Sequence, residues 1–265
     1  VLIDEGKIIA AGLRDLVQGH ELAQKARLLD AGGRVILPGF VDSHTHPVFA
    51  GPRLKDFEAR LKGKTYAQIA EDGGGILSTV NGVRGASLSA LTESLRERAG
   101  RFLECGTTTI EAKSGYGLDL SNELKMLQAI KAVNEAGPLE LIATFLGAHA
   151  VPGEMKHDRE GYLKRICDEM LPAVAKDKLA TFVDVFCEKG YFTVEESQRL
   201  FEVAAKHGLK PKIHAEQLTR SGSIPMSVAA GAVSADHLEC IDDSDLPHLA
   251  KGGIVAALVP GSNYF

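Results

Sequence analysis

The stretch ILPGFVDSHTHP, residues 36–47, places two histidines directly after a run of apolar and β-branched residues. Such a run is typical of a buried β-strand, and His44 and His46 are separated by a single residue. Side chains at positions i and i+2 of a strand point to the same side. The stretch therefore predicts a strand, Val35–Asp42, followed by two imidazoles that point in one direction.

The pattern that begins at this stretch continues to the end of the chain. Apolar runs alternate with segments whose apolar residues recur at helical spacing. The expected strands are Val35–Asp42, Thr107–Ala112, Leu139–Ala148, Thr181–Cys187, Lys210–His214, Ala232–His237 and Ile254–Val259. The expected helices are Leu91–Cys105, Asn122–Glu135, Gly161–Ala175, Val194–His207, Ser223–Ala230 and Asp243–Ala250. Continuous apolar strands joined by helices predict an α/β fold with a parallel sheet that is covered on both faces.

Such a sheet is either doubly wound or closed into a (β/α)8 TIM-type barrel. No expected strand is followed by the GxGxxG motif that would favour the first. Polar residues stand at the carboxyl ends of six different strands: His44, Glu111, His149, Glu188, His214 and His237. In a barrel these ends meet at one mouth, where active sites are built, whereas an open sheet spreads them along an edge. The sequence therefore favours the barrel.

The barrel, residues 36–265, is predicted to be truncated after strand seven, because no eighth strand can be found. Residues 1–35 differ from the rest. The stretch VLIDEGKIIAAG has two β-rich runs around an acidic turn, which predicts a hairpin. We expect it to be part of a small β-sandwich-like domain. The chain begins at Val1 and stops at VPGSNYF after the last strand, and both ends are expected to be cuts through a longer protein.

Composition and charge limit the classes of partner. Thirty basic and 35 acidic residues are spread without a block of like charge, which argues against a nucleic acid or an anionic membrane surface. The sequence has neither a membrane-length apolar run nor a signal-peptide layout. Four cysteines without a CxxC pair indicate reduced thiols. We expect a cytoplasmic protein, whose oligomeric state stays open with a homodimer as one possibility.

The paired histidines allow two interpretations. His44 and His46 can chelate one cation through ring nitrogens at about 2.0–2.1 Å, or they can be an ordinary pair of surface histidines. Three further histidines, His149, His214 and His237, each end a strand. Any one of these alone is more often a hydrogen-bonded core residue than a ligand. Five of the nine histidines at one predicted rim favour a metal site.

Several strings carry a family resemblance. LPGFVDSHTH, KIHAE and SADHLE resemble the amidohydrolase superfamily of metal-dependent barrel hydrolases. The longer strings HTHPVFAGPR, EAKSGYGL, TFLGAHAVP, DVFCEKG and HAEQ are similar, within that superfamily, to the imidazolonepropionases. The resemblance covers nearly the whole chain. It implies one zinc or iron ion held by His44, His46 and His214.

The same resemblance implies the reaction. Metal-activated water would hydrolyse the cyclic amide of a small-molecule substrate, 4-imidazolone-5-propanoate, to N-formimidoyl-L-glutamate in histidine degradation. The family has a fourth metal ligand, an aspartate that ends the eighth strand, and none of the seven expected strands supplies it. Asp236, one residue before His237, is expected to point away from the mouth. Lys189 is also expected to face away, so the lysine that bridges two metals in related enzymes is missing and one ion is favoured.

Two residues are candidates for proton transfer. His237 matches the family's DHLE string at a strand end and is the first candidate for the base. Glu216 is a possible proton carrier beside His214. Gln217 stands where deaminases of the superfamily carry a glutamate. An amide cannot titrate, so Gln217 argues against deamination and suits hydrogen bonding to a heterocycle.

Three further residues are expected to bind the substrate. Arg53 follows the histidine pair and can hold a carboxylate tail through two hydrogen bonds, although a solvent-exposed arginine is the simpler interpretation without the resemblance. Tyr116 lies on a glycine-flanked loop that allows close approach of a ligand. His149 matches the family's ring-contacting histidine. Glu111 and Lys113 are expected only to orient their neighbours.

Two alternatives remain open from the sequence. The chain could be another ring amidohydrolase, of the dihydroorotase, hydantoinase or deaminase type. It could also be an inactive truncated fragment or a metal-poor binding module. A panel of cyclic substrates distinguishes the first alternative, and metal analysis of the purified protein distinguishes the second.

Overall fold

The computed structural model describes residues 1–65, 68–69 and 72–263. It divides into two compact units, Val1–Pro38 and Gly39–Phe265. The boundary lies close to the predicted one after residue 35. The assignment of the first unit to a β-sandwich-like domain stays a prediction.

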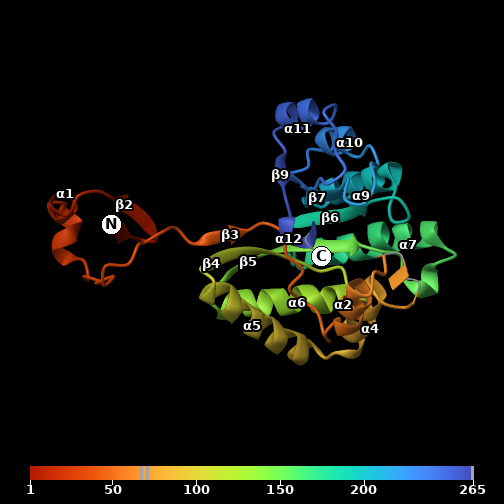
Figure 1. The fold of residues 1–265 in the computed structure, drawn as a ribbon, viewed down its shortest axis with the longest axis horizontal. Coiled ribbons are helices and arrows are strands. Elements are labelled where there is room, and N and C mark those ends of the chain that lie inside the picture. The colour runs from red at the N-terminus through yellow and green to blue at the C-terminus, as the bar shows by residue number, and fades with distance from the viewer. Residues whose placement is uncertain (66–67, 70–71, 264–265) are drawn as a thin grey trace. The chain divides into compact units, whose positions relative to one another are not determined.

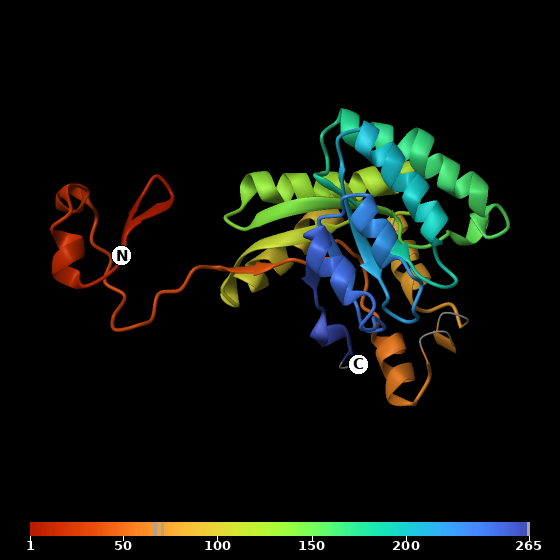
Figure 2. The ribbon, with the colours of Figure 1, turned by 90° about the horizontal axis from the view of Figure 1, so that it is seen from above.

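The first unit begins with the predicted hairpin. Strands β1 (Leu2–Asp4) and β2 (Lys7–Ala10) pair in antiparallel fashion (Figure 2). The two residues of the turn, Glu5 and Gly6, both have positive φ, 47° and 74°. Positive φ at both turn positions matches the twist of the flanking strands. The short helix α1 (Arg14–Gln18) and the 3-10 helix η1 (Glu21–Lys25) follow.

The second unit is built on a parallel sheet of seven strands (Figure 1). Each strand pairs with the next strand along the chain, from β3 to β9, and no pair is antiparallel. A doubly wound sheet would reverse its strand order at a switch point, and this one does not. The prediction of a (β/α)8-type barrel with seven of its strands is therefore confirmed. The strands are β3 (Phe40–Asp42), β4 (Thr107–Lys113), β5 (Glu140–Ala148), β6 (Phe182–Cys187), β7 (Lys210–Ala215), β8 (Ser234–His237) and β9 (Val255–Ala257).

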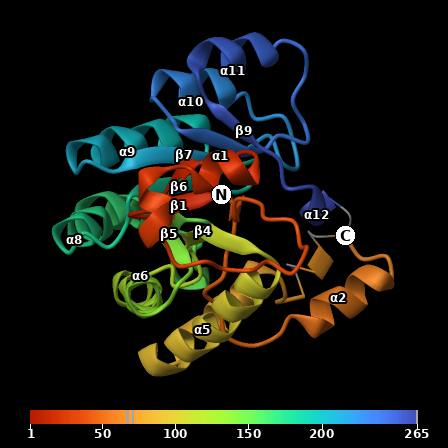
Figure 3. The ribbon, with the colours of Figure 1, turned by 90° about the vertical axis from the view of Figure 1, so that its left-hand side faces the viewer.

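Helices lie round the outer side of this sheet, as Figure 3 shows for α5, α6, α8, α9, α10 and α11. Aliphatic side chains between the helices and the strands form one continuous core. The helices of this unit are α2 (Leu54–Leu61), α4 (Ile76–Gly85), α5 (Leu88–Glu104), α6 (Leu120–Ala136), α7 (Arg159–Arg165), α8 (Leu171–Lys176), α9 (Val194–Lys206), α10 (Ile224–Ala229), α11 (Leu246–Gly252) and α12 (Pro260–Asn263), with the 3-10 helix η2 (Gly153–Met155) and the π-helical turn η3 (Ile166–Met170). None of the described helices has the length and apolar character needed to span a membrane.

The start of α9 shows how local sequence sets an element. Thr193 Oγ1 accepts a hydrogen bond from Glu196 N at 3.2 Å, and the Glu196 carboxylate accepts one from Thr193 N at 2.8 Å. This reciprocal pair satisfies backbone N–H groups that have no partner inside the helix. The helix ends just before Gly208, whose φ is 76°.

The strand expected at Val35–Asp42 is shorter in the structure. Only Phe40–Asp42 pairs with a neighbour, and the side chains of Val35, Ile36 and Leu37 are exposed. Pro38 has no N–H to donate to a neighbouring strand, so strand pairing begins only after it. Helices α2 and α4 were not expected from the sequence, and the helix predicted at Gly161–Ala175 is interrupted by η3.

Alternation along the strands separates an apolar outer layer from a polar interior. On β4, Ile110 and Ala112 belong to the core under the helices, whereas Glu111 and Lys113 hydrogen-bond with residues of other strands. The same alternation places buried polar residues of the neighbouring strands toward one another. These residues are Thr144, Asp184, Lys212, His214 and Asp236. The inner surface of the barrel is therefore a charged, hydrogen-bonded layer.

Candidate active site

Four imidazoles from three parts of the chain meet at the carboxyl ends of the strands. His44 and His46 follow β3, His214 is on β7 and His237 ends β8. The ring centroid of His44 lies 4.6 Å from that of His214 and 4.9 Å from that of His237. The Nε2 atoms of His46 and His214 are 3.3 Å apart. The predicted convergence of these histidines is present.

This arrangement fits a metal ion. Two ligands at about 2.0–2.1 Å from one tetrahedral ion lie roughly 3.3 Å apart, which is the separation of the His46 and His214 nitrogens. In the described part of the chain, His44, His214 and His237 also offer one nitrogen each within 4.8 Å of one another. The predicted ligand set of His44, His46 and His214 shares two members with this group. A fourth imidazole, His237, thus lies close enough to His44 and His214 to bind the same ion.

Carboxylates behind the rings orient two of these histidines. Asp236 Oδ2 lies 2.7 Å from His44 Nδ1. A carboxylate can only accept, so His44 carries its proton on Nδ1 and directs the lone pair of Nε2 toward the other rings. Asp184 Oδ2 lies 2.9 Å from His214 Nδ1, although the N–H does not point straight at it. Such partners fix the tautomer and increase the basicity of a ligating histidine.

The expectation that Asp236 points away from the mouth is wrong. Its side chain is fully buried and bonds to His44, in register with His214 on the next strand. By alternation it is then His237 that should face outward. His237 has a φ of 81°, however, so the strand geometry ends there and its ring turns back toward His44. Both residues consequently face the same side.

A buried ionic network lies among these carboxylates. Lys113 Nζ is 2.6 Å from Asp184 Oδ2, 2.9 Å from Glu111 and 3.4 Å from Asp236 Oδ2. Lys212 Nζ lies 2.7 Å from Glu111 Oε1. Burial would lower the pKa of Lys113, but Asp184, Glu111 and Asp236 together raise it above the usual value. Both ammonium groups face the carboxylates that a second cation would need.

This network was missed by the sequence analysis, which gave Glu111 and Lys113 only a general orienting role. The signal was present, because Asp184 and Lys212 are charged residues in the middle of otherwise apolar strands. Charged side chains are almost never fully buried unless they are paired. Their partners lie on β4: Lys113 for Asp184, and Glu111 for Lys212.

Lowered pKa values favour the neutral form of His46, His149, His214 and His237. Burial lowers the pKa of His46 and His214 well below the usual value, and neighbouring imidazoles add to the effect. Burial also lowers the pKa of His237, and it lowers that of His149 to about 4. A neutral imidazole offers the lone pair that a metal ion requires.

These shifts predict how the stability of the metal-free protein depends on pH. His149 protonates at about 4 when folded and at 6.5 when unfolded, so the unfolded state binds more protons between these values. The free energy of unfolding should fall as the pH decreases from 6.5 to 4, by up to about 3 kcal/mol for this group. Urea titrations at several pH values measure the slope. The His149→Asn variant should show a shallower slope, and an equal slope would contradict the assignment.

One cavity, of about 550 Å³, adjoins the imidazoles. It is lined by all eight residues that the sequence analysis assigned to metal ligation, substrate binding and the base: His44, His46, His214, His237, Arg53, Tyr116, His149 and Gln217. Glu216 is the one predicted site residue that does not line it. The volume falls in the range of small-molecule sites.

Three predicted substrate-binding groups have defined surroundings in this cavity. His149 Nδ1 is 2.9 Å from Gly115 O, which can only accept, so His149 Nε2 carries a lone pair. The Tyr116 ring lies 5.2 Å from that of His149. Arg53, at the start of α2, donates through Nε to Asp56 at 2.8 Å.

Glu216 lies elsewhere. Its fully buried carboxylate accepts hydrogen bonds from the backbone N–H and the hydroxyl of both Ser221 and Ser223, and its φ is 52°. These contacts hold the loop after β7 together. The prediction that Glu216 carries protons therefore gains no support from its placement. Glu188 accepts in the same way from Leu218 N and Thr219 N, which belong to the same loop.

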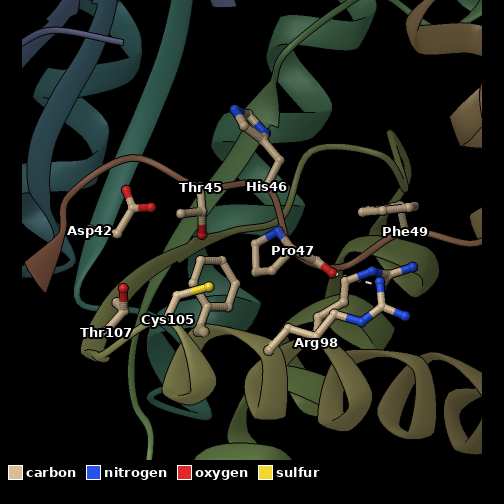
Figure 4. Close-up of a pocket in the computed structure, with 10 residues that line it drawn as sticks. Asp42, Thr45, His46, Pro47, Phe49, Arg98, Cys105 and Thr107 are labelled. Carbon is tan, nitrogen blue, oxygen red and sulfur yellow. Dashed lines mark hydrogen bonds between the residues drawn. The ribbon is translucent and has the colours of Figure 1, made fainter. Parts of the chain in front are cut away.

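A second cavity lies on the other side of the turn that carries His46 (Figure 4). Arg98 donates to Pro47 O at 2.9 Å, and its guanidinium lies 3.5 Å from the centroid of the Phe49 ring. In Figure 4 the His46 ring points away from Arg98 and Cys105. The contacts of Arg98 therefore stabilise the turn on this side, and the imidazoles face the other cavity.

Known proteins resemble this chain along its whole length. Imidazolonepropionase of Shouchella clausii is 45% identical over 267 residues, which are 100% of this chain and 60% of the relative. Imidazolonepropionase of Brevibacillus brevis is 42% identical over 267 residues, which are 100% of this chain and 63% of the relative. Over its whole length, the chain is therefore similar in sequence to imidazolonepropionases. It spans less than two thirds of the length of these relatives. No protein-family model matches it.

Solved structures outside the imidazolonepropionase family have the same fold. A 5-methylcytosine deaminase from Klebsiella pneumoniae matches with a TM-score of 0.60 and 15% identity, over 87% of this chain and 57% of that one. An adenine deaminase from Arthrobacter aurescens matches with a TM-score of 0.58 and 17% identity, over 86% and 73%. These likenesses support the barrel and carry no argument about the substrate.

Proposed function

We propose that this chain forms the catalytic barrel of an enzyme that hydrolyses the cyclic amide of 4-imidazolone-5-propanoate to N-formimidoyl-L-glutamate. The observation that carries the proposal is the single cavity on which all the candidate ligand and substrate groups converge. The similarity to imidazolonepropionases over the whole chain supports the same reaction. The rival is another ring amidohydrolase of the dihydroorotase, hydantoinase or deaminase type.

We infer one zinc or iron ion, held by His44, His46 and His214, with His237 beside it. When bound, the ion lowers the pKa of a coordinated water and polarises a carbonyl oxygen. Lys113 and Lys212 support a single ion, because their ammonium groups already neutralise Glu111 and Asp236. Asp184 and Asp236 hold the imidazoles in the orientation that ligation needs.

The remaining roles belong to residues of the cavity wall. His237, neutral and 3.3 Å from Glu239 Oε1 through Nδ1, is the base that accepts the proton of the attacking water. The proton then passes to the ring nitrogen that leaves. Gln217 hydrogen-bonds the ring without titrating, which favours hydrolysis over deamination. Tyr116 and His149, which line the same cavity, contact the ring through their side chains.

The propionate tail predicts a specific role for Arg53. Arg53→Ala should raise KM about 10- to 100-fold with little change in kcat, because a charged hydrogen-bond pair to the tail is lost in ground and transition state alike. Steady-state kinetics with imidazolonepropanoate measure both constants. Arg101→Ala, on α5 and outside this cavity, is the control. An unchanged KM in Arg53→Ala would reject the tail-binding role.

A substrate panel tests the function itself. The purified protein, loaded with zinc or with iron, is assayed on imidazolonepropanoate, dihydroorotate, a hydantoin and cytosine. Turnover of imidazolonepropanoate alone supports the proposal, and turnover of another ring without it supports the rival. We also infer a cytoplasmic location, since the proposed substrate is a metabolite of an amino acid, and a homodimer is compatible with it. Sedimentation analysis decides the oligomeric state.

A further inference from the structure

One buried carboxylate holds the loop that forms a wall of the cavity. Glu123, in the first turn of α6, is completely shielded from solvent. Its Oε2 accepts from Gly115 N at 3.0 Å, and its Oε1 accepts from Gly117 N at 2.7 Å and Leu118 N at 2.9 Å. Three backbone N–H groups of one short loop thus converge on a single side chain. Hydrogen bonds to an ionised acceptor are stronger than those between neutral groups.

The loop is shaped to fit this carboxylate. Gly115 has a φ of 104° and Leu118 one of 54°, both in the region that side chains rarely adopt. A Cβ on Gly117 would lie 2.4 Å from Glu123 N. The backbone therefore lies directly against the start of α6, and a side chain at Gly117 would force it away.

Two groups of the cavity depend on the position of this loop. Tyr116 stands between the two glycines whose N–H groups bond to Glu123. Gly115 O accepts from His149 Nδ1 at 2.9 Å and so fixes the tautomer that leaves His149 Nε2 available. A Cβ on Gly115 would lie 3.0 Å from His149 Nδ1. The loop therefore presents one ring and orients the other.

We propose that Glu123 is a positioning residue that sets Tyr116 and His149 in the cavity by fixing residues 114–118. The part that concerns ring binding rests on the proposed function, whereas the part that concerns the loop does not. Glu123 touches no ligand itself, because its carboxylate is buried beneath the loop.

Hydrogen exchange tests the fixing of the loop. Glu123→Gln keeps the shape of the side chain but replaces one acceptor oxygen by an NH2 group, which cannot accept from a backbone N–H. We expect the amides of Gly115, Gly117 and Leu118 to exchange at least about tenfold faster in this variant, with the amides of β5 unchanged. Unchanged exchange at all three loop amides would overturn the proposal, whether or not the protein is active.

Kinetics test the consequence for the cavity. Glu123→Gln should raise KM about tenfold and lower kcat by less than about threefold, because the ring-binding wall is displaced while the imidazole cluster stays in place. Tyr116→Phe should raise KM as well. If Glu123 acts through Tyr116, the KM increase in the double variant is smaller than the product of the two single increases. A fully multiplicative result would overturn this coupling.

A second variant and a control complete the design. Gly117→Ala displaces the same loop without changing any charge, and it should reproduce the KM increase of Glu123→Gln. Glu196→Gln is the control, because it also replaces a carboxylate that accepts from a backbone N–H. Glu196 lies at the start of α9 and does not line the cavity, so KM should stay unchanged. If Gly117→Ala keeps the KM of the unmodified protein, the proposal is overturned. If the unmodified protein hydrolyses no imidazolonepropanoate, the proposed function fails and the exchange data still decide the role of Glu123.

Discussion

Replacing His44 by alanine should leave the purified protein with almost no zinc or iron. His44 and His214 are the two residues common to the predicted ligand set and to the group of imidazoles whose nitrogens lie within 4.8 Å of one another. The Nε2 atom of His44 is the one that would bind the ion, because Nδ1 is hydrogen-bonded to Asp236. Loss of a ligand from so small a set should release the ion and abolish turnover. Plasma emission spectroscopy after gel filtration measures the metal content.

The same measurement on two further variants decides between the ligand sets. If the family resemblance holds, His46→Ala loses the ion, whereas His237→Ala retains it and loses only turnover. If instead the ion is held by His44, His214 and His237, whose nitrogens lie close together, His237→Ala loses the ion. His157→Ala, at an exposed position in the loop before α7, is the control and should keep both metal and activity. Full metal retention in His44→Ala would reject the site.

The second large effect is expected at Lys113. Lys113→Met removes the ammonium that three buried carboxylates share, and it leaves Glu111, Asp184 and Asp236 with less compensation. Breaking a buried ionic contact in this way costs about 3–5 kcal/mol of unfolding free energy. For a unit of this size, Tm should fall by roughly 10 °C. Differential scanning calorimetry of the metal-free protein measures the shift.

The loss at Lys113 should depend on pH in a definite direction. Burial works against ionisation of Asp236, but His44, Lys113 and Lys212 hold the pKa of this carboxyl below its usual value. Its stabilising contribution is complete above the unfolded pKa of 3.8 and is lost as the pH falls through the lower folded value. The difference between Lys113→Met and the unmodified protein should therefore be largest near neutral pH and shrink in acid. Lys131→Met, exposed on α6, is the control, and a pH-independent difference would contradict the ionic explanation.

Strands and most helices could be predicted because their signals are local. Six of the seven strands lie within a few residues of their predicted bounds, since local stretches of apolar and β-branched residues mark most of them. The exception is β3, where Pro38 and solvent exposure shorten the paired segment. Helices α2 and α4 were missed because the glycines between them resemble a loop and because their helical patterns are short.

The site was predictable to the extent that it follows from strand ends. Eight of the residues singled out from the sequence line one cavity, because the carboxyl ends of parallel strands converge. Asp236 and His237 could not be placed by alternation, since the positive φ at His237 ends the strand pattern at that residue. The partners of Lys113 depend on inter-strand register, which a single sequence does not specify.

The hydrogen bond between His44 and Asp236 joins positions 192 residues apart, from the first strand of the sheet to the sixth. Contacts of such sequence separation raise the contact order and form late, after most of the loop-closure entropy has been overcome. The catalytic geometry should accordingly be the last part of the barrel to assemble and the first to be lost. A bound ion would then stabilise the contact between distant strands of the sheet, and removal of the ion by a chelator would favour partial unfolding.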